Sequence, residues 1–400
     1  MSEWREVAVE ALCSRVTSGG TPSRKRADYY TDEGIPWVKS KELIGARIAT
    51  TEEHISEAGL ERSSAKLLPP DTVLLAMYGA NVGQLGWLGV EATVNQAICA
   101  MVTDPKEADA RFLYYALAGA RERLVGNAHG AAQQNLSQQL IKPFKLAVPA
   151  LATQQRIGAI LRSIDELIEN NRRRIEVLEK MARAIYREWF VKFRYPGHED
   201  VPMVDSALGP IPEGWRAATI GDALELKYGK ALKASARRGG GVAVVSSAGV
   251  VGWHDESFVD GPAIVVGRKG NVGSVHWVDG PCWPIDTAYF VQTDLPLRFV
   301  SEQLRRTAFT NSHAAVPGLS REAAYAQPFL LPDVQVLDSF HALVDPLGSH
   351  ATGLMSQNEK LAEVRDLLLP KLVTGQIDVS SLDLDAVIST GSTEESAVAQ

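Results

Sequence analysis

The chain has 400 residues, of which 45% are hydrophobic and 22% charged, and this ordinary balance excludes a disordered or fibrous protein and favours two globular domains. Charged residues near the start exclude a signal peptide, and the lack of any run of about 18 apolar residues excludes a membrane span, so we expect a cytoplasmic protein. The net charge of −7 does not exclude nucleic-acid binding, because ten carboxylates against three Lys and Arg residues in 336–400 account for all of it.

Residues 1–150 are predicted to form a first α+β domain. Short Val, Ile and Leu runs such as TVLLAMY (72–78) are separated by Gly, Pro and Asn, which is typical of strands joined by turns, and residues 108–124 have helical spacing. Basic and amide side chains lie in its Gly-rich loops, where they could contact phosphates and base edges or could simply be solvated. The candidate DNA-contacting residues here are Arg24, Lys25, Arg26, Tyr78, Asn81, Gln133, Gln134 and Asn135.

Residues 151–195 are predicted to form a long helical spacer. From Ile157 to Trp189 apolar residues recur alternately every four and three positions, which predicts the seam of a coiled coil, although a core helix of a bundle would give a similar stripe. The seam includes Ile164, Ile168, Asn171, Ile175 and Leu178. Four prolines and three glycines then indicate a surface linker that occupies residues 196–214.

Residues 215–335 repeat the first domain. NVGQLGW (81–87) recurs as NVGSVHW (271–277), and further segments recur in the same order at a spacing of roughly 190 residues, which indicates a tandem duplication. One departure is that SSAGVVGW (246–253) stands where the first half has GIPWVKSKEL (34–43). The matching candidates for DNA contact are Lys227, Lys230, Lys233, Arg237, Arg238, Arg268, Lys269, Asn271 and His313.

Residues 336–377 repeat the helical spacer more loosely, with Leu354, Asn358 and Leu361 in the seam. If a pseudo-twofold axis relates the halves, the two helices form an antiparallel coiled coil that separates two globular domains. Asn171 and Asn358 could then hydrogen-bond across the seam and fix its register; the alternative is that either amide faces water. Residues 378–400 are expected to be a partly disordered tail.

No catalytic or metal-binding motif stands in a suitable context. The sequence lacks GxxxxGK[ST], HExxH and GxSxG, its eight histidines do not cluster, and Cys13, Cys99 and Cys282 have no ligand or disulfide spacing. We therefore expect no catalytic residue and no metal. An enzyme such as a DNA methyltransferase with an unrecognised motif, and a coiled-coil scaffold without DNA affinity, stay open as alternatives.

Three segments resemble the specificity subunits of Type I restriction-modification systems. They are the stretch LATQQRIGAILRSIDELIENNRRRIEVLEKMARAIYREWFVKFRYPG (151–197), the opening SGGTP...YY...GIPWVKSKEL (18–43) and LLLPKLVTGQI (367–377). The resemblance covers nearly the whole chain. It implies two target recognition domains that each read one half of a bipartite double-stranded DNA site, with the helices as a ruler between them.

The resemblance also implies partners. Two methyltransferase (modification) subunits, and then restriction and translocase subunits, would assemble on the chain. S-adenosylmethionine, ATP and Mg²⁺ would belong to those subunits, so no cofactor is expected in this chain. Recognition loops vary within such families, so the target bases cannot be read from the residues.

Overall fold

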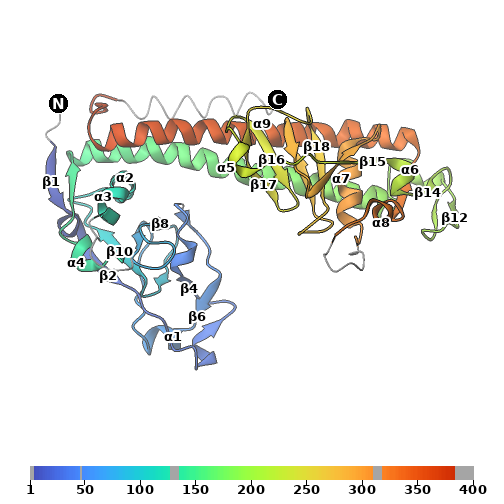
Figure 1. Ribbon diagram of the computed structural model, residues 1–400. Coiled ribbons are helices and arrows are strands. Elements are labelled where there is room, and N and C mark those ends of the chain that lie inside the picture. The colour runs from blue at the N-terminus through green and yellow to red at the C-terminus, as the bar shows by residue number, and fades with distance from the viewer. Residues whose placement is uncertain (1–3, 46, 127–134, 310–317, 383–400) are drawn as a thin grey trace. The chain divides into compact units, whose positions relative to one another are not determined.

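The computed structural model describes residues 4–45, 47–126, 135–309 and 318–382. The chain divides into two compact units: unit 1 is Met1–Asn170 with Asn358–Gln400, and unit 2 is Asn171–Gln357. Both divisions fall inside long helices. Each unit therefore holds one mixed α/β domain together with a part of each helix (Figure 1).

The domain of unit 1 is built on a five-stranded sheet in the order β2-β10-β7-β8-β5. Its strands are β2 (Cys13–Ser18), β5 (Arg47–Ile48), β7 (Val73–Ala76), β8 (Leu85–Leu88) and β10 (Ile98–Thr103). All residues of β7 and β8 are buried, which explains why TVLLAMY is an unbroken apolar run and not an alternating one.

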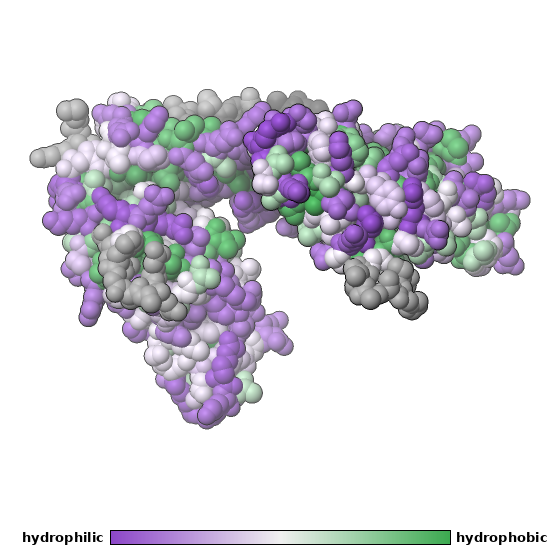
Figure 2. Space-filling model, in the orientation of Figure 1, coloured by the Kyte–Doolittle hydropathy of each residue, from purple (hydrophilic) through white to green (hydrophobic). Residues whose placement is uncertain are grey.

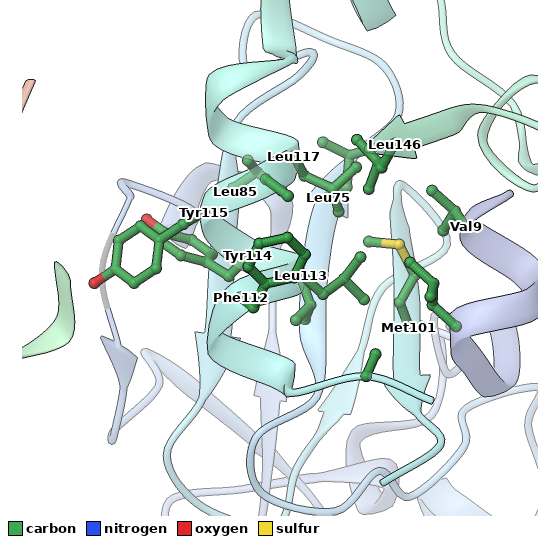
Figure 3. Packing of buried hydrophobic residues seen from close by; sticks show 14 of the residues in the cluster. Val9, Leu75, Leu85, Met101, Phe112, Leu113, Tyr114, Tyr115, Leu117 and Leu146 are labelled. Atoms are coloured by element: carbon green, nitrogen blue, oxygen red, sulfur yellow. The ribbon is translucent and has the colours of Figure 1, made fainter. Parts of the chain in front are cut away.

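Helix α2 (Ala110–Gly119) covers this sheet. It begins after Asp109, whose side chain accepts hydrogen bonds from the backbone N–H groups of Arg111 and Phe112 and so caps the helix. Figure 3 shows the buried face of the helix packed on side chains of the strands. The labelled cluster comprises Val9, Leu75, Leu85, Met101, Phe112, Leu113, Tyr114, Tyr115, Leu117 and Leu146.

A second sheet of unit 1 has the order β3-β6-β4-β9. Its central strand β4 pairs antiparallel with β6 and parallel with β9. The ends of the domain come together in a separate pair, β1 with β11. These strands are β1 (Arg5–Ala8), β3 (Tyr30–Thr31), β4 (Ile35–Val38), β6 (Glu53–Ile55), β9 (Thr93–Val94) and β11 (Lys145–Val148).

Unit 2 repeats most of these pairings, and only β3 and β5 of unit 1 find no counterpart among its described strands. The order β15-β21-β18-β19 matches β2-β10-β7-β8, β16 pairs antiparallel with β17 and parallel with β20 as β4 does with its neighbours, and β14 pairs with β22. The predicted duplication is thereby confirmed. The strands are β14 (Arg216–Thr219), β15 (Glu225–Tyr228), β16 (Val242–Ser246), β17 (Gly249–His254), β18 (Ala263–Gly267), β19 (Val275–Val278), β20 (Cys282–Pro284), β21 (Ala288–Gln292) and β22 (Pro328–Leu331).

The shorter helices also recur. Helices α2 and α7 follow the matching strands β10 and β21, and α4 and α8 precede the matching strands β11 and β22. Their bounds are α1 (Glu57–Glu61), α3 (Arg121–Gly126), α4 (Gln138–Ile141), α6 (Ile220–Ala223), α7 (Leu297–Arg306) and α8 (Arg321–Tyr325).

The domains differ most between β4 and β6. In unit 1, residues 39–52 separate these strands and contain a 3-10 turn and β5. In unit 2, only Ser247 and Ala248 separate β16 from β17. The sequence comparison detected a departure at this place, and the structure shows its cause: unit 1 has an extended excursion where unit 2 has a tight hairpin.

In unit 1, the first part of α5 (Leu151–Phe190) packs against the last part of α9 (Val334–Val373). Asp165 on α5 forms an ion pair with Arg365 on α9 at 2.9 Å, and the Nδ2 of Asn358 donates to the carbonyl of Ile168 at 3.4 Å. Residues further along α5 thus contact residues nearer the start of α9. The two helices are therefore antiparallel in unit 1, as predicted.

Unit 2 shows the same antiparallel arrangement between the remaining parts of the helices. The Nδ2 of Asn171 donates to the Oε1 of Gln357 at 3.0 Å, and Trp189 and Phe190 pack against Phe340 near the start of α9. Both seam amides thus bond across the helix pair of their own unit. A direct Asn171–Asn358 hydrogen bond stays a prediction.

The seam residues are shielded along both helices. Ile168, Asn171 and Leu354 are buried, with exposed fractions of 5%, 1% and 6%. The others are half-buried: Ile164, Ile175, Leu178, Asn358 and Leu361.

The bounds of both long helices differ from the sequence prediction. Helix α5 ends at Phe190, short of residue 195, because the chain turns at Phe193 with a φ of 59° and stacks Tyr195 on Trp215. Helix α9 covers 334–373 where 336–377 was predicted. The linker 196–214 contains the strand pair β12 (Met203–Val204) and β13 (Ile211–Pro212).

The C-terminal end of α9 returns to the core of unit 1. Val379, in the segment predicted as a tail, has an exposed fraction of 2% and belongs to the same cluster as Val9 and Leu12. Residues 383–400 lie outside the described residues. Across the described ranges, no helix has both the length and the apolar character that crossing a bilayer requires.

Candidate nucleic-acid interface

The repeated NVG sequences form hairpin loops at matching places. Residues 77–84 join β7 to β8, and residues 268–274 join β18 to β19. The N–H of Gly83 donates to the carbonyl of Ala76 at 2.9 Å, and that of Gly273 donates to Gly267 at 2.8 Å. Both loop glycines have positive φ, 77° and 75°, which favours glycine. The repetition of the motif therefore reflects turn geometry, while the side chains around it are free to differ.

The hairpin loop of unit 1 presents neutral polar groups. Tyr78 is exposed by 37%, and the Nδ2 of Asn81 donates to the carbonyl of Ser40 at 3.1 Å, which ties the loop to the excursion after β4. The corresponding loop of unit 2 is cationic: Lys269 and Asn271 are exposed and Arg268 is half-buried. The two predicted loop sets thus occupy equivalent positions and differ in charge.

A second segment flanks each hairpin loop. The N–H of Leu136 donates to the carbonyl of Met77 at 2.7 Å, and the N–H of Leu319 donates to the carbonyl of Arg268 at 2.8 Å. Asn135, next to the first of these contacts, is exposed. The candidates Gln133, Gln134 and His313 lie outside the described residues.

The basic run Arg24–Arg26 in unit 1 is largely neutralised by carboxylates. The Nη1 of Arg24 lies 2.5 Å from Glu53, and the guanidinium stacks over Tyr30 at 4.3 Å. Arg26 makes two hydrogen bonds to Asp28, at 2.7 and 2.8 Å. Lys25 is exposed and, among the described residues, has no carboxylate partner. DNA contact by this run stays a prediction.

The acidic partners of this run belong to a wider network. Lys39 contacts Glu52 at 2.8 Å and Glu53 at 2.6 Å. Hydrogen bonds from Arg24, then from Lys39, lower the pKa of Glu53 to about 2. Sequence reasoning missed this network because Glu52 and Glu53 lie almost thirty residues from Arg24 and are brought close only by the pairing of β4 with β6.

The basic residues in and after β15 have different surroundings. Lys227 pairs with Glu225 at 2.6 Å, the Nζ of Lys230 lies 5.4 Å from the ring of Trp283, and Lys233 is exposed. Tyr228, between the first two lysines, is exposed by 47%.

Arg237 and Arg238 lie against β17. The Nη1 of Arg237 donates to the carbonyl of Val251 at 2.6 Å. Arg238 pairs with Asp255 at 2.9 Å and with Glu256 at 2.7 Å, so most of its charge is offset. Phosphate contact by these two arginines stays a prediction.

Arg321 was not predicted. Its guanidinium carbon lies 4.7 Å from the centroid of the Tyr228 ring, and that of Arg268 lies 5.0 Å from the same centroid. The repeat itself carries a signal for it, because SHAAVPGLS (312–320) corresponds to HGAAQQNLS (129–137), and the next residue in each half is Arg321 and Gln138.

The described residues show no group of His, Cys, Asp or Glu side chains that could hold a metal ion. Burial raises the pKa of the thiols of Cys13 and Cys99 to about 12 and that of Cys282 to about 11. None of the three is disulfide-bonded. Raised pKa values disfavour the thiolate form of these cysteines, which is the reactive one.

Comparison with known proteins gives a consistent result. Residues 1–180 match the model of the Type I restriction modification DNA specificity domain family. The Type I restriction enzyme MjaIX specificity subunit of Methanocaldococcus jannaschii is 26% identical over 92% of this chain and 92% of that protein. The EcoR124I/EcoR124II specificity subunit of Escherichia coli is 25% identical over 44% of this chain and 46% of that protein.

A solved structure shares the fold. The crystal structure of a Type I restriction-modification S subunit from M. genitalium superposes with a TM-score of 0.63 at 18% identity, over 93% of this chain and 96% of that one.

Proposed function

The chain belongs to the specificity subunits of Type I restriction-modification systems, and from this premise we propose that it reads a bipartite double-stranded DNA site with one half-site for each domain. The duplicated domain carries the proposal. Two domains with the same strand pairings present loops of different chemistry at matching places, as two readers of different half-sites require.

The chain itself is non-catalytic, and it works in a complex with methylase and restriction subunits. We propose two methyltransferase subunits, because each unit offers a comparable part of the helix pair. Apolar residues exposed on these helices support docking there (Figure 2). They include Leu167, Val364 and Leu367 in unit 1 and Val177, Met181 and Met355 in unit 2.

The remaining components belong to the partners in this proposal. S-adenosylmethionine, ATP and Mg²⁺ would be bound by the methyltransferase and by the restriction and translocase subunits, not by this chain. The complex would act in the cytoplasm, where its DNA target lies. The helix pair would set the distance between the half-sites.

Exchange of one domain tests the proposal. We expect that replacing residues 1–150 with the corresponding domain of a related specificity subunit changes one half-site of the methylated sequence and leaves the other intact. The measurement is sequencing of methylated sites in cells that also carry the methyltransferase. The reciprocal exchange of residues 215–335 should change the other half-site alone. Methylation of the original sequence after either exchange would refute the assignment of one half-site to each domain.

A further inference from the structure

A tyrosine and two arginines form a compact cationic cluster in unit 2. Tyr228 ends β15, Arg268 follows β18, and Arg321 begins α8, so three separate elements supply the group. Both guanidiniums stack over the Tyr228 ring, and the Tyr289 ring packs against Tyr228 at 5.1 Å. We call Tyr228, Arg268 and Arg321 the Tyr228 cluster.

The charge of the cluster is not offset. Among the described residues, neither Arg268 nor Arg321 pairs with a carboxylate, whereas Arg24, Arg26 and Arg238 all do. The neighbouring stretch 310–317 contains no Asp or Glu that could supply one. Lys269, next to Arg268 in the hairpin loop, is exposed and adds a third cation. A dianionic or polyanionic ligand is therefore favoured at this surface.

The guanidiniums are also held in place. The Nη1 of Arg268 donates to the carbonyl of Asp286 at 2.9 Å, and Arg321 is fixed by the start of α8 and by the ring of Tyr228. Both side chains are half-buried, so they cannot extend far from the domain. Guanidiniums fixed in this way suit a group that approaches the surface, such as a backbone phosphate, better than a base edge deep in a groove.

Unit 1 has no such cluster at the matching positions. The N–H of Leu136 donates to Met77, and the N–H of Leu319 donates to Arg268, so Met77 and Arg268 occupy matching positions. Gln138 and Arg321, each two residues after its leucine, match in the same way. The matching strands β2 and β15 end at Ser18 in unit 1 and at Tyr228 in unit 2, and a glycine follows each. All three positions are neutral and non-aromatic in unit 1.

We infer that the Tyr228 cluster binds backbone phosphates of the DNA, and that it makes the second domain the main source of salt-sensitive affinity. This inference rests on the proposed function and deepens it. Sequence recognition by the second domain then depends on other loop residues, while the cluster anchors the duplex and sets the register of reading.

The test uses the full chain assembled with its methyltransferase subunits. The variants are R268Q and R321Q, the latter giving unit 2 the residue that unit 1 has at this place. Affinity for a duplex containing the methylated site is measured over a series of salt concentrations. Each variant should lower the slope of log K against log salt by about 0.9 and weaken binding about 5–10-fold at 0.1 M salt. The methylated sequence should not change.

Two further variants serve as controls. R238Q removes an exposed arginine whose charge is already paired with carboxylates, and its slope should stay close to that of the wild type. R321K restores the charge and should restore the slope. Unfolding midpoints of all variants show whether any loss comes from misfolding.

The possible results separate the inference from the proposed function. An unchanged salt slope in R268Q and R321Q, with site-specific methylation intact, overturns the inference alone. Relaxed recognition of one base without a change of slope identifies a base contact and also overturns it. Equal losses in R238Q and R321Q contradict the role assigned to unpaired charge. A wild-type complex that prefers no DNA sequence overturns the proposed function, and the inference with it.

Discussion

At the scale of single residues, partners decide which charges can act on DNA. Arg24 and Arg268 both lie in Gly-rich loops, but the first pairs with Glu53 and the second has no carboxylate partner in the described part of the chain. A pairing at 2.5 Å offsets most of the field that an arginine presents to a phosphate. The basic run of unit 1 therefore contributes less positive potential than its sequence suggests.

The Glu53 network predicts a pH-dependent stability. Its pKa lies near 2 in the folded chain and at its ordinary value of 4.5 in the unfolded chain, so its contribution is complete above about pH 4.5 and is lost as the pH falls towards 2. We expect E53Q to lower the unfolding temperature by about 1–3 °C at pH 7, since the pairs are partly exposed and screened. The difference should shrink as the pH falls to 3.5.

Thermal unfolding of E53Q and wild type at several pH values measures this effect. E61Q, which changes an exposed glutamate of α1, is the matched control and should follow the wild-type profile. A difference between E53Q and wild type that is constant from pH 7 to pH 3.5 would contradict the ionic origin.

Asp165 shows how one carboxylate joins a domain to the helices. Its Oδ2 accepts a hydrogen bond from the Tyr115 hydroxyl at 2.6 Å, and its Oδ1 accepts from Arg365 at 2.9 Å. Arg365 breaks the apolar seam of α9, and the sequence offered no reason for it. The structure supplies one, because Arg365 is the cation that balances a half-buried acid.

At the scale of elements, Gly348 of α9 leaves room for the side chain of Arg298, which belongs to the domain of unit 2. A Cβ at Gly348 would lie 1.7 Å from the guanidinium carbon of Arg298, which stacks over Trp277 at 4.5 Å. Asp279 accepts hydrogen bonds from Trp277 at 2.8 Å and from Thr352 at 2.6 Å. The close approach at Gly348 thus allows the helix to hold the domain by stacked and hydrogen-bonded groups.

Alanine substitutions at two glycines of α9 should change the free energy of unfolding in opposite directions. In G353A the added Cβ has no neighbour within 4 Å, so the higher helix propensity of alanine should raise the free energy of unfolding by about 0.5–1 kcal/mol. G348A displaces Arg298 from Trp277 and should lower it by about 1 kcal/mol despite the same propensity gain. Denaturant unfolding followed by tryptophan fluorescence gives both values. Equal stabilisation by the two substitutions would show that Arg298 moves aside at no cost.

At the scale of the whole molecule, the proposed ruler can be shortened without changing either domain. Residues 167–173 of α5 and 354–360 of α9 are matched across the antiparallel pair and lie between the two contacts Asp165–Tyr115 and Thr352–Asp279. Deleting both heptads preserves the seam phase and removes about 10 Å of helix. We expect the spacer between the half-sites to shorten by about three base pairs, or specific binding to be lost.

The spacer length is read by sequencing methylated sites of the double-deletion variant. Deleting only one of the two heptads is the control: it puts the helices out of register and should destabilise the chain. Methylation of the original spacer by a folded double-deletion variant would exclude the helix pair as the ruler.

The sequence by itself determined the duplication, the fold class and the antiparallel coiled coil. These features depend on local periodicity, such as the seam from Ile157 to Trp189, and on repeated turn residues, such as the glycines of the two NVG loops. Both can be recognised from residues that are close together in the sequence. The ends of α5 and α9 were less accurate. They depend on aromatic packing around Trp215 and on the return of Val379 to the core, which are contacts between distant segments.

Only the tertiary structure decided which candidate residues keep a usable charge. Glu53 reaches Arg24 through strand pairing, Asp255 and Glu256 reach Arg238 across a hairpin, and Arg321 joins Arg268 over a tyrosine from another strand. Electrostatic pairing acts through distances of a few ångströms in space, whatever the separation along the chain. The sequence therefore shows where cations occur, and the fold decides which of them lack a carboxylate partner within the described residues.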